Sequence, residues 1–175
     1  LFQAKCLGVF PAGSADPWRV IPEEDVARCR FIDPAYEDDP DAVHIGGLDI
    51  GGGGDRTVLV ERIGSSVGRI ESFSDRDPMA TVGKLVELGY PQLYRYDTDK
   101  YGWRTDMSTR NHLIATLLDA VRGADVVIRD RETLDECYNL IRNPRNMKIE
   151  AREGTYDDRM MSLGKGLKVA LGLIL

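Results

Sequence analysis

The chain of 175 residues is 42% apolar and carries a formal net charge of −6, which suits one domain with a full core. No apolar run is long enough to cross a bilayer and no signal-peptide pattern opens the chain, so we expect no membrane partner. The acidic excess lies in residues 1–101, while residues 102–175 are nearly neutral. This balance argues against strong autonomous DNA binding, because affinity for phosphates comes from Lys and Arg.

The first part of the chain predicts a short helix followed by three strands. Residues 1–43 form a lead-in, in which Pro22 and the acids after it predict a helix over about 23–30. Strands are expected at about 44–51, 57–62 and 69–73. Glycine-rich turns join them, which indicates an antiparallel meander.

From residue 77 onward, predicted helices and strands alternate. Asp77-Pro78 begins a helix that ends near Gly89, and a strand follows at about 92–97. Next come a helix capped by Ser108, a strand at 125–129, a helix at 133–142, a strand at 147–151 and a last helix from about Tyr156. This order predicts an α/β fold: a mixed sheet of five or more strands flanked by helices, in a single domain whose body is residues 44–175.

Acidic residues stand at three positions that this arrangement brings together. Asp49 ends the first strand, Asp97 ends the fourth, and Asp157 and Asp158 open the last helix. Carboxylates that end buried segments must be paired or hold a cation. Taken singly, the helix-start pair could serve the helix dipole and Asp97 could begin a turn. Together, these carboxylates are typical ligands of hard divalent ions, and two such ions can bind and stabilise a phosphoryl group during its hydrolysis.

The glycines at 51–54 do not form a nucleotide-binding P-loop. That motif needs Gly-Lys-Ser/Thr opening a helix, whereas residues 55–57 lead into a strand. We expect the glycines to give the turn its tight geometry and to keep bulk away from a metal-bound phosphate. Five basic residues are candidates for DNA contact, with a solvated surface as the alternative for each: Arg56, Arg104, Arg110, Lys148 and Arg159. The cysteines, Cys6, Cys29 and Cys137, are widely spaced and predict small buried side chains rather than a zinc site.

The segments 47–58 and 150–163, with Gly102 placed five residues after Asp97, resemble the nuclease domain of bacteriophage large terminase subunits. Phe10-Pro11, residues 102–105 and residues 134–137 add weaker matches. Asp97 stands where many relatives have Glu, and Asp99 stands where they often have Asn. Ser162-Leu163 stands where Ala-Leu is usual, which is a mild departure.

The resemblance implies a ribonuclease H-like fold and an endonuclease that cuts double-stranded DNA during viral genome packaging. It implies two metal ions, Mg²⁺ or Mn²⁺, held by Asp49, Asp97, Asp157 and Asp158. The implied partners are double-stranded DNA, an N-terminal ATPase domain of the same polypeptide, a portal and a small terminase subunit. That ATPase domain is absent from these residues, and a chain that begins at Leu1 is expected to be a piece of something longer. The implied location is the cytoplasm of the infected or lysogenic bacterial host.

Three other interpretations remain open. A different ribonuclease H-like nuclease, such as a resolvase or transposase domain, would use similar acids. A non-catalytic DNA-binding or portal-docking module would not need them. Residues 49–52 also resemble a phosphate loop of actin-like sugar kinases, but 175 residues are too few for the two domains that those enzymes require.

Overall fold

The main sheet has three antiparallel strands in the order β1-β2-β3. They are β1 (His44–Asp49), β2 (Thr57–Ile63) and β3 (Ser66–Phe73). The computed structural model describes residues 16–30, 41–51, 55–74, 77–90, 94–97, 100–103 and 105–173. Asp49, the last residue of β1, lies opposite Val58 of β2. The predicted meander is thereby confirmed, with β3 beginning three residues earlier than expected.

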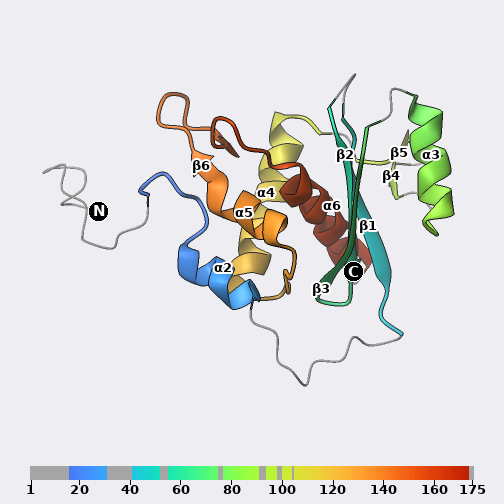
Figure 1. Ribbon diagram of the computed structural model, residues 1–175, viewed down its shortest axis with the longest axis horizontal. Coiled ribbons are helices and arrows are strands. Elements are labelled where there is room, and N and C mark those ends of the chain that lie inside the picture. The colour runs from blue at the N-terminus through green and yellow to red at the C-terminus, as the bar shows by residue number, and fades with distance from the viewer. Residues whose placement is uncertain are drawn as a thin grey trace, which may run out of the picture.

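Helices cover this sheet on both sides. The last helix, α6 (Asp158–Leu173), packs directly on β1 and β2, and α4 (Met107–Gly123) packs on α6. Helix α3 (Pro78–Glu87) lies on the other side of the sheet (Figure 1). The apolar side chains Val58, Leu59 and Val60 of β2 are all buried. A strand buried on both faces needs such a continuous apolar run. None of the helices in the described ranges is long and apolar enough to span a membrane.

The lead-in contributes to the same core. Helix α2 (Glu23–Arg30) packs on α4 and on α5 (Arg131–Asn139), and Ile21 and Val26 are fully buried. Cys29 is buried and its thiol donates to the Val121 carbonyl oxygen at 3.3 Å, while the free Cys137 is buried beside Met160. The boundary at residue 43 therefore does not divide the core. Cys6 lies outside the described residues.

The sheet of five or more strands is not confirmed within the described residues. Strand β4 (Arg95–Asp97) pairs with β5 (Lys100–Tyr101), and β6 (Leu140–Arg142) pairs with β7 (Ile149–Ala151), each as a separate two-stranded sheet. The strand expected at 125–129 is wrong, since there only Val127 makes an isolated parallel bridge, to Ser66.

Two local expectations are also corrected. The helix expected to reach Arg142 ends at Asn139, because Leu140 turns extended and pairs with Ala151. Asp106 rather than Ser108 caps α4. Its side chain accepts from the N–H groups of Ser108 and Thr109, and the Thr109 hydroxyl accepts in return from the Asp106 N–H at 2.8 Å. This reciprocal pair is a capping box, which satisfies N–H groups that the helix itself leaves free.

The contact between α6 and β1 is close enough to require glycine at position 47. A Cβ atom added to Gly47 would lie 1.8 Å from the Ser162 carbonyl oxygen. The Ser162 hydroxyl is itself buried and donates to the Val58 carbonyl at 2.8 Å. Backbone therefore meets backbone here, and the first two turns of α6 are fixed relative to the end of β1.

Replacing Gly47 by Ala should destabilise the fold by about 3 kcal/mol, because a backbone atom cannot move aside as a side chain can. Gly83 in α3 has nothing within 4 Å of an added Cβ, so Gly83→Ala should stabilise by roughly 0.5–1 kcal/mol through helix propensity. Urea unfolding of both variants measures the difference. Equal stability of the two would contradict this packing.

Candidate active site

An ion pair between Asp49 and Lys165 lies where α6 crosses the end of β1. The Lys165 ammonium donates to Asp49 Oδ1 at 2.6 Å and to the Leu48 carbonyl oxygen at 2.9 Å. The Lys165 side chain is 10% exposed and that of Asp49 is 30% exposed. A lysine is rarely this buried without a partner. Asp49 is thus the counter-ion that allows Lys165 to remain in the helix–sheet interface.

Asp158, the first residue of α6, faces the same place. Burial raises the pKa of its carboxyl above the ordinary value and the negative charge of Asp49 raises it further, whereas the Arg56 guanidinium acts in the opposite direction. The Arg56 guanidinium lies 3.5 Å from Asp158 Oδ2 and stacks 4.6 Å from the centre of the Tyr156 ring. Asp49 and Asp158 are therefore close enough for the charge of Asp49 to raise the pKa of the Asp158 carboxyl.

Asp157 has a different partner. It directly precedes α6, and its carbonyl oxygen accepts from the Met161 N–H at 2.8 Å, as expected at a helix start. Its carboxylate oxygen Oδ2 accepts from Arg110 of α4 at 2.5 Å. Asp157 thus ties α6 to α4, and Asp158 is the member of the pair that interacts with Asp49.

The start of α6 is capped by a residue that the sequence did not single out. Glu136 of α5 is buried, and its carboxylate accepts from the N–H groups of Arg159 and Met160 at 2.9 and 3.0 Å. Burial raises the pKa of Glu136 to about 7; the two N–H groups lower it and the Asp158 charge raises it. Glu136 belongs to a helix with an apolar face, but its burial depends on where α6 docks. A cap supplied by another helix leaves no sequence signal.

The basic residues proposed for DNA contact fall into different settings. Arg159 is buried, and its guanidinium binds Asp130 at 3.0 Å and also Glu132. This ion-pair network places Arg159 in the helix interface rather than on a surface that could meet phosphates, which corrects its assignment. Lys148 is exposed in the turn between β6 and β7. Arg56 and Arg110 are partly exposed beside the acids, and Arg104 lies outside the described residues.

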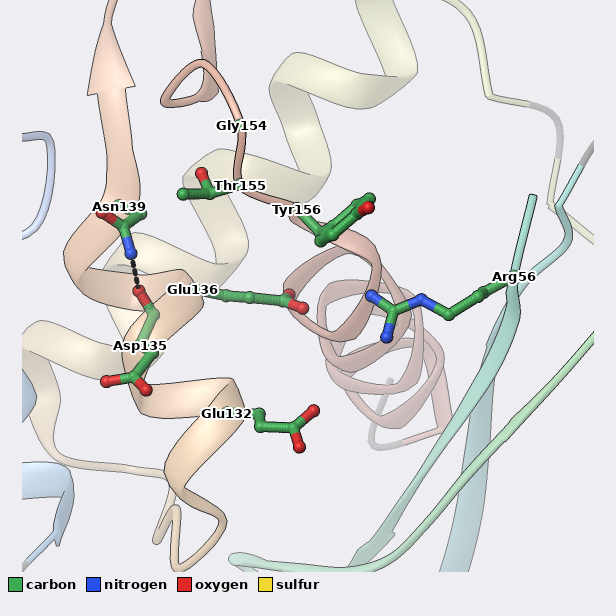
Figure 2. A pocket seen from close by; sticks show the side chains of 8 residues that line it. All are labelled: Arg56, Glu132, Asp135, Glu136, Asn139, Gly154, Thr155 and Tyr156. Atoms are coloured by element: carbon green, nitrogen blue, oxygen red, sulfur yellow. Dashed lines mark hydrogen bonds between the residues drawn. The ribbon is translucent and has the colours of Figure 1, made fainter.

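A pocket of about 340 Å³ opens beside the start of α6 (Figure 2). Arg56, the residue before β2, reaches toward it, and Glu132 and Glu136 point into it from α5 (Figure 2). Its further lining residues are Asp135, Asn139, Gly154, Thr155 and Tyr156. Three carboxylates against one guanidinium make it a poor cavity for a phosphate group.

The donor set of the site fits a hard divalent ion. Within the described residues, no group of three or more His, Cys, Asp or Glu side chains is arranged to hold a metal. The backbone of Asp97 lies in β4, but its side chain is outside the described part. Mg²⁺ is often held by only one or two carboxylates together with water and substrate phosphates. Asp49 and Asp158 supply such a pair.

The α/β fold of this chain resembles that of several solved structures. The large terminase nuclease of thermophilic phage G20c with bound magnesium superposes with a TM-score of 0.62 at 18% identity, over 74% of this chain and 82% of that chain. The cobalt-bound form of that nuclease gives 0.60 at 18% identity, over the same shares of both chains. The large terminase nuclease domain of Thermus phage P74-26 gives 0.58 at 21% identity, over 74% and 81%.

This chain therefore shares its fold with the nuclease domains of phage large terminases, as the sequence resemblance implied. No protein-family model matches the sequence, and no curated protein matches it either. At identities of 18–21%, the likeness lies in the arrangement of elements.

The raised pKa of Glu136 predicts a pH dependence of stability. Because its folded pKa of about 7 exceeds the ordinary value of 4.5, the folded state binds the proton more tightly, so this residue costs stability as pH rises from about 4.5 to 7. Glu136→Gln keeps an acceptor for the N–H groups and carries no charge. We expect the stability of Glu136→Gln relative to the parent to increase between pH 5 and pH 8. Urea titrations at both pH values test this, and a difference independent of pH would contradict it.

Proposed function

We propose that the chain is the nuclease domain of a phage or prophage large terminase subunit, a metal-dependent endonuclease that cleaves double-stranded DNA during genome packaging. One observation carries the proposal: within a fold shared with terminase nucleases, Asp49 and Asp158, which are 109 residues apart in the sequence, are close enough for their charges to interact. The Mg²⁺- and Co²⁺-bound forms of the G20c nuclease support a divalent metal in this fold.

In the proposed hydrolysis of a phosphodiester, the acidic residues bind the metal ions and Arg56 binds the phosphate. Asp49 and Asp158 would hold Mg²⁺ or Mn²⁺, with Asp97 and Asp157 as the further expected ligands of a two-metal site. When bound, these ions stabilise charge on the phosphoryl oxygens and lower the pKa of the attacking water. Arg56 lies beside Asp158 and is held by the Tyr156 ring. It is positioned to bind a phosphate that approaches the acid pair.

The wider setting follows from the same proposal. A terminase nuclease domain is joined to an N-terminal ATPase domain and works with a portal and a small terminase subunit in the cytoplasm of the bacterial host. A resolvase or transposase domain of the same fold class is the alternative enzyme. A docking module without catalysis has one observation in its favour, since Asp49, Asp157 and Asp158 each already have a basic partner.

Substitution of the acids distinguishes the nuclease from the docking module. Asp49→Asn should abolish plasmid cleavage and also lower stability by on the order of 1–3 kcal/mol, because Lys165 loses its charged partner. Asp158→Asn should abolish or strongly reduce cleavage without loss of stability, because its charge is disfavoured in the fold. Asp157→Asn should be milder toward cleavage.

The matched control is Asp119→Asn, an identical change at an exposed position of α4, which should leave cleavage unchanged. Melting curves confirm that each variant is folded. A folded Asp49→Asn variant that cleaves at the parent's rate would overturn the proposed function.

Metal and salt dependence form an independent prediction. Mn²⁺ should support cleavage at least as well as Mg²⁺, because an open acid site binds Mg²⁺ weakly without DNA. Cleavage should fall steeply as salt rises, since a domain of net charge −6 relies on a few cationic contacts. Plasmid nicking with Mn²⁺ and with Mg²⁺, each over a range of salt concentrations, measures both effects. Activity in chelator, or a rate independent of salt, would contradict the prediction.

A further inference from the structure

Lys165 is a buried cation, and no function described above uses it. It lies seven residues after Asp158 on α6, and residues two turns apart share one face of a helix. Its side chain is 10% exposed. Burying an ammonium group is costly unless it is paired, so its two acceptors, Asp49 and the Leu48 carbonyl, determine where it stays.

Lys165 cannot easily move as a whole, because the helix that carries it is fixed on β1. Gly166, its neighbour, packs near the Gly47 backbone, where an added Cβ would lie 3.5 Å from the Gly47 nitrogen. Ser162 is fixed by its bond to the Val58 carbonyl. The only freedom left to Lys165 is in its own side chain. Its ammonium can leave Asp49 and still keep the Leu48 carbonyl as an acceptor.

The position of the ammonium is that of a cation bound to Asp49. It lies 2.6 Å from Oδ1 and occupies one of the lone-pair sites that this carboxylate can offer to a metal ion. Its positive charge also opposes a second cation at the same carboxylate. Arg56 has a looser relation to Asp158, at 3.5 Å and with a side chain 37% exposed. The Lys165–Asp49 ion pair is therefore shorter than the Arg56–Asp158 pair and opposes metal binding more strongly.

We infer that Lys165 is a built-in counter-ion of Asp49 that competes with the divalent ion, so that metal binding at this site is an exchange of one cation for another. The inference rests on the proposed function, because it takes Asp49 as a metal ligand. The exchange keeps metal affinity low in the free domain. A DNA phosphate adds negative charge at the site and shifts the balance toward the divalent ion. Lys165 thus links metal loading, and with it cutting, to the presence of substrate.

Metal binding itself provides the test, by calorimetric titration of the DNA-free protein with Mn²⁺. Lys165→Met has a side chain of similar length without the charge. It should bind Mn²⁺ at least about tenfold more tightly than the parent, because a competing unit charge is removed. Without metal, it should also melt at a lower temperature than the parent. Added Mn²⁺ should raise its melting temperature by more than that of the parent. Lys165→Gln, the second neutral variant, should change affinity in the same direction.

Two controls isolate the position and the charge. Lys168→Met removes the same charge three residues further along α6 and should bind Mn²⁺ as the parent does. Lys165→Arg keeps the charge, so its affinity for Mn²⁺ should remain as low as that of the parent. If the parent binds Mn²⁺ and the folded neutral variants bind it equally or more weakly, Lys165 does not compete and the inference is overturned. If no variant and no parent protein binds Mn²⁺ even at millimolar concentration, the proposed metal-dependent function fails and the inference fails with it.

Discussion

The direct packing of α6 on β1 is the constraint on which the site depends. At Gly47 the helix meets the strand backbone to backbone, and an added methyl group would collide with the Ser162 carbonyl. This contact brings the first turn of α6, with Asp158, and its third turn, with Lys165, to the end of β1, where Asp49 lies. The strand and the helix are far apart in sequence, so the acid pair exists only when the two are docked.

The charges of the site are balanced before any metal binds. Lys165 pairs with Asp49, Arg56 with Asp158 and Arg110 with Asp157. Such pairing lets a domain of net charge −6 gather carboxylates at one place without severe repulsion. The three cations differ in burial, since the side chains of Lys165, Arg110 and Arg56 are 10%, 30% and 37% exposed. Asp157 also joins α6 to α4 through its ion pair with Arg110, so under the proposed function Asp158 is the acid of the pair that is nearer to the chemistry.

Short-range signals explain what the sequence predicted. The strands β1 to β3 and the helices α2, α3 and α6 follow from apolar periodicity, proline and capping acids, all readable within a few residues. The strand β7 was predicted, but its partner β6 was missed because a three-residue strand directly after a helix looks like the end of that helix. Lys165 and Glu136 were missed because their partners lie 116 and 23 residues away. Pairing over such separations is set by tertiary packing, which one sequence does not display.

The most direct test of the account is a crystal of the domain soaked in Mn²⁺ and measured at a wavelength where manganese scatters anomalously. The account predicts an anomalous peak in contact with Asp49 and Asp158, with the Lys165 ammonium displaced from Asp49 and still bound to the Leu48 carbonyl. A peak found only at other surfaces, with Lys165 unmoved on Asp49 at saturating Mn²⁺, would contradict the claim that these two acids form a metal centre.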